Sequence, residues 1–515
     1  MKVVLYILAV IVFFQSCVNS YRILIVLQEP VKSHFNVFKP LVRELARKNH
    51  NVTLVAHFSS GIEETENYRE HLLENKHDLA AYFSKIREEG NVKLDRWGSV
   101  SRFAKASLIF CDDDLSDKAI VDLRNSREEY DLIILEHFCN DCFLGVAGVF
   151  NAPVIGISST ALLTWHNDRF GNIDNPSYIP NPLYLFSNRM NFWERCENFL
   201  VTMYTKLYYN MITSNNDIRF AEKYFGEKID SMSEFAAKRT SLIFVNTHFT
   251  LSFPRPLVPN VVEIGGIHLP ENQRLPQNIE KFINESKHGV IYFSLGSMIK
   301  GHTFPQEKKD AFLKAFARLP QRVLWKWENE TMPGKPDNVM IQKWMPQFDI
   351  LSHPNVKAFI SHGGLLGTTE AVHCGVPMMV MPQYGDQYTN AKAVEANGGG
   401  VILYLKDATE EKVYNNLKTI LDPEFRAKAK ALSERFRDRP MSPMDTAIYW
   451  VEYVARHKGA PHMKTAAVDM PLYQYLLLDV LAFLGLILLV FSYISYKILS
   501  LVLRSVFSKK KVKQN

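Results

Sequence analysis

Short apolar runs alternate with stretches of helical periodicity over the first part of the chain. The runs that predict buried strands are 22–27, 52–56, 132–135 and 154–157. Between them, residues 35–48 repeat apolar side chains at helical spacing, and a second helix is expected near residues 141–150. Strands that alternate with helices in this way predict a parallel sheet with helices on both faces.

A second series of the same kind begins near Ser241. Its expected strands are 242–245, 290–293, 323–327, 339–342, 357–360, 377–381 and 401–403. Its expected helices are 306–318, 364–374, 386–396 and 409–421. The stretch 254–276 is rich in proline and glycine and is interpreted as a linker. The pattern predicts an α/β fold of two Rossmann-like halves, 21–240 and 241–457. They should face a cleft and bind ligands at the carboxyl ends of their strands.

Both ends of the chain carry apolar segments of another kind. After Lys2, an apolar run leads to small residues at Val18-Asn19-Ser20, so residues 1–20 are interpreted as a cleaved secretory signal peptide. A buried strand and an uncleaved anchor are the alternatives. Residues 475–496 carry one charge, Asp479, and as a helix would span about 33 Å, enough to cross a bilayer. A core helix is the alternative, but such helices seldom stay apolar on every face.

Positive charge gathers after the second apolar segment. Residues 497–515 hold six lysines and arginines and no acid, which equals the formal net charge of the whole chain, +6. The basic balance therefore does not indicate a nucleic-acid partner. Because positive flanks mark the cytosolic side, we expect a single-pass protein with a lumenal body, a juxtamembrane segment at 458–474 and a cytosolic tail. Lys511 and Lys513 resemble the dilysine signal for retention in the endoplasmic reticulum, with a generic basic flank as the alternative.

A lumenal body would meet glycosylation enzymes and an oxidising environment. Sequons at Asn51, Asn284 and Asn329 predict N-glycosylation. Five cysteines remain after removal of the signal peptide, and this odd number predicts at least one free thiol or an intermolecular bond. The pair Cys139-Asn-Asp-Cys142 is interpreted as structural, at a helix start. A redox pair and half of a zinc site are the alternatives.

The segment 344–387 carries the densest candidate chemistry. The expected strand 357–360 ends in Ser361-His362-Gly363-Gly364, a glycine-rich turn that opens a helix. Bare amides and the positive end of the helix suit a diphosphate there. His362 can add a hydrogen-bond donor to the same phosphates.

Further side chains of the segment suit the rest of a nucleotide sugar. Trp344 offers a flat face for a base, and the Glu370 carboxylate can bind two ribose hydroxyls. Asp386 and Gln387 can bind sugar hydroxyls. Each feature alone is commonplace, since a glycine pair before a helix is usually a turn and a lone tryptophan is usually core. Their conjunction indicates a nucleotide-sugar site.

The whole segment resembles, position by position, the signature of the UDP-glycosyltransferase family in its microsomal animal branch. The match includes the six residues between Glu370 and Pro377 and the closing Asp-Gln pair. Residues 361–370 are most similar to insect members, and residues 293–298 match a further family motif. The resemblance extends over nearly the whole chain and implies a GT-B type fold.

The resemblance also implies a role for each donor-site residue. At the diphosphate, the implied contacts are Ser297, His362 and the turn at Gly364 and Gly367. The resemblance further implies that Trp344 stacks on uracil, Gln347 lies beside the base and Glu370 binds the ribose. For the transferred sugar, it implies contacts with Asp386 and Gln387. Many vertebrate relatives have Asn where Leu366 stands here. Because leucine cannot donate to phosphate, Gly367, Thr368 and backbone amides must serve alone. Insect members often show this apolar choice, so we do not infer a loss of activity.

Transfer of a sugar to a hydroxyl needs a base for its proton. The resemblance implies that His34, in the loop after the first strand, is this base, and a neutral imidazole suits the task. A histidine with only a structural role at a helix start is the alternative. In many relatives an aspartate orients the histidine, and the matching position here holds Glu136, which reaches one methylene further. His137 and Asp141 are the alternative partners.

Together these features predict an enzyme that transfers a sugar with inversion from a UDP-sugar to a hydroxyl of a small lipophilic acceptor. UDP-glucose is expected before UDP-glucuronate because of the insect-like motif. The loop 158–190, with Trp165, Phe170 and Tyr178, is expected to line the acceptor pocket. The motif has no acidic metal pair, so neither a metal nor a cofactor is expected, the UDP-sugar being a co-substrate.

Two rival interpretations remain open. Leu366 and Glu136 would also suit a catalytically weak chain that binds UDP-sugar and assembles with active relatives, and a homo- or hetero-oligomer is compatible with either function. A dinucleotide-dependent oxidoreductase also uses Rossmann-like halves. However, no G-x-G-x-x-G follows the first strand, where Pro30 and His34 stand instead.

Overall fold

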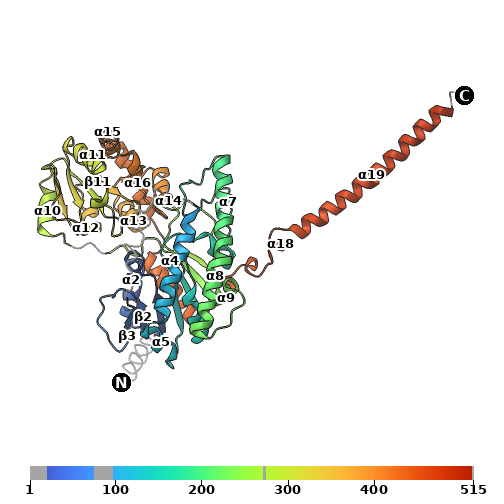
Figure 1. The fold of residues 1–515 in the computed structure, drawn as a ribbon, viewed down its shortest axis with the longest axis horizontal. Coiled ribbons are helices and arrows are strands. Elements are labelled where there is room, and N and C mark those ends of the chain that lie inside the picture. Colours follow the sequence, from blue (N-terminus) through green and yellow to red (C-terminus); the bar gives the residue numbers. More distant parts are fainter. Residues whose placement is uncertain (1–19, 75–96, 271–273, 513–515) are drawn as a thin grey trace, which may run out of the picture. The chain divides into compact units, whose positions relative to one another are not determined.

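The computed structural model describes residues 20–74, 97–270 and 274–512. It separates into two compact units, residues 1–464 and 465–515, and each is described by itself. The predicted signal peptide, except for Ser20, lies outside the described residues. Figure 1 shows the strands and helices of the first unit in two groups, one mostly blue to green with an orange-red segment among them, and the other yellow to orange.

Within the described residues, the first sheet has seven parallel strands in the order β3-β2-β1-β4-β5-β6-β7. The strands are β1 (Arg22–Leu27), β2 (Asn51–Ala56), β3 (Tyr68–Leu72), β4 (Leu132–Glu136), β5 (Val154–Ser158), β6 (Thr240–Val245) and β7 (Val261–Glu263). The α-helices of this half are α2 (Lys32–Arg47), α4 (Gly98–Leu115), α5 (Lys118–Asn125), α6 (Val146–Val149), α7 (Phe192–Tyr208), α8 (Ser214–Phe220) and α9 (Met232–Arg239). Shorter 3₁₀ or π turns are η1 (Cys142–Gly145), η2 (Thr164–Phe170), η3 (Tyr209–Thr213) and η4 (Ala221–Phe225).

The second sheet, counted over the same described ranges, has six parallel strands in the order β10-β9-β8-β11-β12-β13. The strands are β8 (Val290–Ser294), β9 (Arg322–Lys326), β10 (Val339–Gln342), β11 (Val356–Ser361), β12 (Met378–Val380) and β13 (Gly400–Ile402). The helices that follow in the chain are α10 (Gln277–Asn284), α11 (Gln306–Ala317), α12 (Gln347–Ser352), α13 (Leu365–Cys374), α14 (Gln387–Ala396), α15 (Glu410–Leu421), α16 (Pro423–Arg437) and α17 (Pro443–His457).

Successive side chains of the central strands enter different cores. Ile23 and Ile25 of β1 pack into one core, whereas Leu24 and Val26 pack into another on the opposite face. In β8 the corresponding pairs are Ile291 with Phe293 and Val290 with Tyr292. Because side chains alternate across a strand, both faces of both sheets are covered. The predicted α/β fold of two Rossmann-like halves is confirmed.

The predicted change of half at residue 241 is wrong. β6 pairs with β5, and β7 pairs with β6, so both strands complete the first sheet and do not open the second. All six residues of β6 are buried. An apolar run predicts that a strand is buried, but it does not say which sheet the strand joins.

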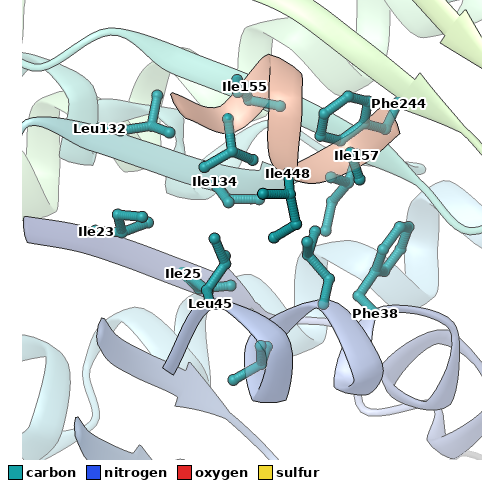
Figure 2. Packing of buried hydrophobic residues seen from close by; sticks show 14 of the residues in the cluster. Ile23, Ile25, Phe38, Leu45, Leu132, Ile134, Ile155, Ile157, Phe244 and Ile448 are labelled. Atoms are coloured by element: carbon teal, nitrogen blue, oxygen red, sulfur yellow. The ribbon is translucent and has the colours of Figure 1, made fainter. Parts of the chain in front are cut away.

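Helix α17 also belongs to the first half, although residues 443–457 were expected in the second. Figure 2 shows Ile448 of α17 among Ile23, Ile134, Ile155 and Ile157 of the first sheet. The apolar stripe of α17 includes Ala447, Ile448, Val451, Val454 and Ala455, all buried. A stripe of this kind needs a core to cover it, and the face of the first sheet beside α2 supplies one.

The chain therefore crosses between the two sheets twice. The first crossing follows β7, and the second lies between α16 and α17. Arg439, in the second crossing, donates from Nη1 to the backbone oxygen of Gly265 in the first, at 2.7 Å. The two crossings thus lie side by side and are joined by a charge-assisted hydrogen bond.

The helix expected near residues 141–150 is interrupted. The 3₁₀ turn η1 comes first, and only the short helix α6 follows. Cys142 in this turn forms a disulfide with Cys111 of α4, and not with Cys139. Among the described residues, Cys139, Cys196 and Cys374 are free thiols. The structural interpretation of Cys142 agrees with this bond, which ties two helical segments of the first half together.

The second unit contains α18 (Leu472–Tyr475) and α19 (Leu478–Val512). Of the residues that the structure describes, only the span Leu478–Ser505 is long and apolar enough to cross a membrane, by length and composition. The helix begins three residues later than expected and continues through the basic tail. No proline or glycine after Gly485 interrupts it.

We predict that Ile448→Ala lowers the free energy of unfolding by about 2–4 kcal/mol, because the substitution leaves a cavity in the core of Figure 2. Urea denaturation of the detergent-solubilised protein, followed by tryptophan fluorescence, measures this change. Arg456→Ala, on the exposed face of the same helix, is the matched control and should cost about 0.5 kcal/mol or less. Equal effects of the two substitutions would contradict the packing of α17.

Candidate active site

A cavity of about 500 Å³ lies where the carboxyl ends of strands from both sheets meet. Residues that follow strands of the first sheet enter it, including His34 after β1, Phe138 after β4 and Ser159 after β5. From the second sheet it receives Ser297 after β8 and the turn after β11. Crevices at the carboxyl ends of parallel strands are the usual ligand sites of such sheets.

The structure brings His34 and Glu136 together. Nδ1 of His34 lies 2.8 Å from Oε1 of Glu136 and 2.9 Å from Oγ of Ser159. The side chain of His34 is 13% exposed, whereas that of Glu136 is 1% exposed and does not line the cavity. The ring of Phe138 meets the imidazole edge to face, with centroids 4.6 Å apart. Because Nδ1 already contacts Glu136 and Ser159, Nε2 is the ring nitrogen that can contact a molecule in the cavity.

Opposing effects set the pKa of His34. Burial by itself lowers this pKa, but the charge and the hydrogen bond of Glu136 raise it, with smaller contributions from Glu29 and Asp386. The net result is a pKa of His34 above its usual value. The longer reach of glutamate at position 136 is therefore compatible with a short contact and with a strong effect on the imidazole.

Asp141 and His137, the alternative partners of His34, make their contacts with other residues. Both carboxylate oxygens of Asp141 accept hydrogen bonds from Arg169, at 2.9 and 2.5 Å. The same carboxylate accepts from Tyr209 and contacts Nδ1 of His137. These side chains are buried and do not line the cavity. Asp141 and His137 thus anchor the loop after β4 and do not contact His34.

Three residues of this buried cluster also lie close enough to share a metal ion. They are His137, Asp141 and His166. The guanidinium of Arg169 already supplies the cation that neutralises Asp141. Burial, with Arg169 beside it, holds the pKa of His166 well below its usual value. The cluster is therefore explained as a buried ion pair of Arg169 and Asp141 with the neutral imidazole of His166 nearby.

The region predicted to receive the diphosphate is built from glycine turns around His362. Gly363 has φ +84°, and a Cβ on Gly364 would lie 2.5 Å from Nε2 of His362. Burial lowers the pKa of His362 to about 4, with help from Lys326, so the imidazole is neutral. Its Nδ1 is buried and makes no hydrogen bond with described residues. The start of α13 thus offers backbone amides and a neutral ring to an anion.

Lys326 was not predicted as a site residue, yet it lines the cavity at the end of β9. Its Nζ donates to the backbone oxygen of Gly296 at 2.8 Å and lies 6.0 Å from the centre of the Trp344 ring. Ser297, which was predicted, lines the same wall. A lysine at this place supplies the fixed positive charge that a diphosphate requires.

The predicted nucleoside residues gather at one end of the cavity. Trp344 is 69% exposed, and Gln347 donates from Nε2 to Oε2 of Glu370 at 2.8 Å. Burial raises the pKa of Glu370 to about 7, although the hydrogen bond from Gln347 lowers it. Gly367 lies against Gln347, since a Cβ there would meet Nε2 at 3.0 Å. An exposed aromatic face beside a buried acid suits a base and its ribose.

The predicted sugar residues lie at the start of α14. Asp386 accepts a hydrogen bond from Asn390 at 2.9 Å, and burial raises its pKa although His34 lowers it. Oε1 of Gln387 accepts from the backbone nitrogens of Gln383 and Tyr384, which leaves its amide NH₂ for a ligand. Asp386 and Gln387 from the second half and His34 from the first half line the same cavity.

Thr368 is the predicted donor residue that the structure places outside the cavity. It is buried, and its hydroxyl has no hydrogen-bond partner among the described residues. On α13, Thr368 follows Gly367 by one residue, so it points about 100° further around the helix and away from the ligand side. Leu366 and Gly367 line the cavity instead.

The loop 158–190 reaches the cavity only in part. Trp165 lines the cavity, whereas Phe170 packs in a separate core with Ile243 and Val245. Tyr178 does not line it. Helix α4, which was not predicted, contributes the remaining wall. The lining on this side of the cavity is Ala106, Ser107, Phe110, Phe138, Cys139, Leu163, Trp165, Pro182 and Leu183.

The sequons lie away from this cavity. Asn284 and Asn329 are exposed, and Asn51 is the half-buried first residue of β2. Oδ1 of Asn284 lies 3.2 Å from Nε2 of His353. N-glycosylation at these positions stays a prediction.

Comparison with known proteins decides the family. The family model described as "UDP-glucoronosyl and UDP-glucosyl transferase" matches residues 21–513. The chain belongs to the UDP-glycosyltransferase family. The family model and the similar proteins, which include insect and mammalian enzymes, therefore confirm the predicted family.

Two curated UDP-glycosyltransferases of Dactylopius coccus match nearly end to end. The chain is 46% identical to UDP-glycosyltransferase UGT5 over 482 residues, covering 92% of this chain and 91% of that protein. It is 41% identical to UDP-glucosyltransferase 2, with 95% of each chain covered. Among solved structures, Spinosyn Forosaminyltransferase SpnP has a TM-score of 0.59 at 18% identity, covering 85% of this chain and 100% of that one. This likeness shows the shared GT-B fold.

Family membership and the acid at position 370 together generate a prediction for UDP binding. Ribose hydroxyls donate to an ionised carboxylate, so affinity should be full above the Glu370 pKa of about 7 and should be lost as the pH falls through it. Isothermal titration should show UDP binding about tenfold weaker at pH 6 than at pH 8. Glu370→Gln should bind weakly at both values. An equal pH dependence in this variant would assign the effect to the UDP phosphate instead.

Proposed function

We propose that this transferase moves glucose from UDP-glucose to a hydroxyl of a small lipophilic acceptor, by direct displacement with inversion. The observation that carries the proposal is His34, which lines the cavity between the halves with Glu136 hydrogen-bonded behind it. This arrangement provides a base on the acceptor side, opposite the residues that suit a nucleotide sugar.

The reaction follows from the positions of these groups. Neutral His34 takes the proton of the acceptor hydroxyl on Nε2, and the oxygen attacks the anomeric carbon. The bond from that carbon to the diphosphate breaks, and UDP leaves with the electron pair. Glu136 stabilises the imidazolium that forms. Lys326, His362 and the amides at the start of α13 receive the charge that develops on the leaving diphosphate.

The acceptor wall supports a lipophilic substrate. Phe110, Phe138, Leu163 and Leu183 line it, and Ser107 adds a polar atom. A cavity with mostly apolar walls and a few polar groups gains binding energy from apolar burial and orientation from the polar contacts.

Charge around the sugar supports glucose over glucuronate. Asp386 lines the end of the cavity assigned to the sugar, so a carboxylate on the sugar would lie close to another acid. Like charges at short range in a partly buried site disfavour each other. The relative named UDP-glucosyltransferase 2 is also compatible with this donor.

We further propose that the protein is anchored in the endoplasmic reticulum membrane with its body in the lumen. The span Leu478–Ser505, followed by basic residues, supports a single crossing with a cytosolic tail. The disulfide Cys111–Cys142 suits an oxidising compartment. The tail lysines 511 and 513 would then act in retention.

A catalytically weak partner is not favoured by the site. Glu136, one of its two motivations, makes the short contact to His34 that an orienting carboxylate needs. Leu366, the other, lines the cavity, where neighbouring amides and Lys326 remain to meet phosphate.

The first test is UDP release by microsomes that contain the full chain. UDP-glucose, UDP-galactose and UDP-glucuronate would each be supplied with a mixture of phenols. Release should be greatest with UDP-glucose and should fall by roughly a thousandfold or more in His34→Ala, which lacks the base. Near-normal turnover by His34→Ala would remove the proposed mechanism, and UDP binding without release from any donor would favour the non-catalytic partner.

The pH dependence provides a second test. His34 must be neutral to take a proton, so kcat/KM should decline as the pH falls through its raised pKa. Glu136→Gln removes the charge that raises this pKa. The acid limb should therefore move to lower pH, and the plateau should drop roughly a hundredfold or more.

Ser159→Ala is the matched control, because it removes the other contact to Nδ1 and leaves the charge of Glu136 in place. Its acid limb should stay where it is in the wild type. An unmoved limb in Glu136→Gln would show that Glu136 does not set the pKa of the base.

A further inference from the structure

Glu29 is an acid at the cavity that the transfer reaction does not use. It follows β1 and lines the cavity, although the residue is only 7% exposed. Its backbone oxygen accepts a hydrogen bond from the nitrogen of Val31 at 2.7 Å, in the turn that leads to His34. The position of Glu29 is therefore fixed by the same turn that places the base.

The carboxyl group of Glu29 is only half satisfied by the protein. Oε1 accepts a hydrogen bond from Nδ2 of Asn140 at 3.0 Å. No described residue donates a hydrogen bond to Oε2, and Glu29 belongs to the cavity lining. Asn140 holds one oxygen from the β4 side, so the other is left for a molecule in the cavity.

A buried carboxylate with only one oxygen hydrogen-bonded costs free energy unless a ligand donates to the other oxygen. Burial, and then the charge of Glu136, raise the pKa of Glu29 to about 7. A purely structural role, as partner of Asn140, would be served by a neutral amide. A hydrogen bond to a carboxylate in a largely apolar pocket is stronger than one between neutral groups.

The location of Glu29 decides which part of the substrate it would meet. Its partner Asn140 follows β4, in the first half, beside Phe138 and Cys139 of the acceptor wall. Glu29 stands five residues before His34, in the turn after β1, and both side chains line the same cavity. The sugar end, with Asp386, belongs to the second half.

We propose that Glu29 determines acceptor specificity by accepting a hydrogen bond from a second hydroxyl, next to the hydroxyl that reacts at His34. The substrate class is thus an ortho-dihydroxy compound, such as a catechol. One hydroxyl gives its proton to His34 and is glycosylated, and its neighbour donates to Oε2 of Glu29. This inference rests on the proposed transfer to acceptor hydroxyls.

The test compares catechol with guaiacol, in which the second oxygen carries a methyl group and cannot donate. The readout is the ratio of kcat/KM for the two acceptors in the full-length membrane protein, with UDP-glucose as donor. In Glu29→Leu this ratio should fall by roughly tenfold to a hundredfold from its wild-type value, because the ionic hydrogen bond is lost. Glu29→Gln keeps an acceptor oxygen and should give an intermediate ratio.

Glu263→Gln is the matched control, since Glu263 is a partly buried acid that also has a raised pKa but does not line the cavity. Its ratio should equal that of the wild type. Guaiacol turnover by each variant reports whether the first half is folded, and Glu29→Gln alone suffices for the test if Glu29→Leu does not fold.

The outcomes separate the two proposals. Turnover of both acceptors with one ratio in the wild type and all variants would overturn the role of Glu29 and leave the proposed function standing. If the wild type releases no UDP with either compound or with the phenol mixture, the proposed function fails, and this inference fails with it.

Discussion

Parallel strand pairing is the constraint on which the site depends. In a parallel sheet every strand ends at the same edge, so residues that follow different strands are brought together there. In the first sheet β1, β4 and β5 are neighbours, and His34, Glu136 and Ser159 come from the ends of these strands. Strand pairing thus brings the proposed base His34 to Glu136 and Ser159, although β1 lies about a hundred residues before β4 in the sequence.

The central strands could be predicted because they are buried on both faces. β1, β4 and β8 are short apolar runs whose alternate side chains enter two cores, and such runs are visible in a sequence. The sequence did not show which of the two sheets each strand or helix packs with. β6 and α17 are apolar in the expected places, but nothing local tells which of two similar cores will cover them. That choice is made by packing between residues far apart in the chain.

The residues of the site were likewise predictable only in part. His362, Glu370 and Asp386 stand in a motif with fixed spacing, and the cavity receives all of them. Lys326 and Glu29 resemble ordinary charged residues in the sequence, and only the fold reveals that they face the same space. Thr368 lies outside the cavity lining for a local reason, since one step along a helix turns a side chain from the cavity side into the core.

The two crossings between the sheets limit how the halves can move. A single connecting segment would act as a swivel, about which one half could rotate in several directions. Two neighbouring segments, joined by the hydrogen bond from Arg439 to Gly265, form instead a hinge that favours rotation about one axis. Opening to admit a donor and closing over it would then share one axis, and His34 would return to the same place opposite Asp386 in each catalytic cycle.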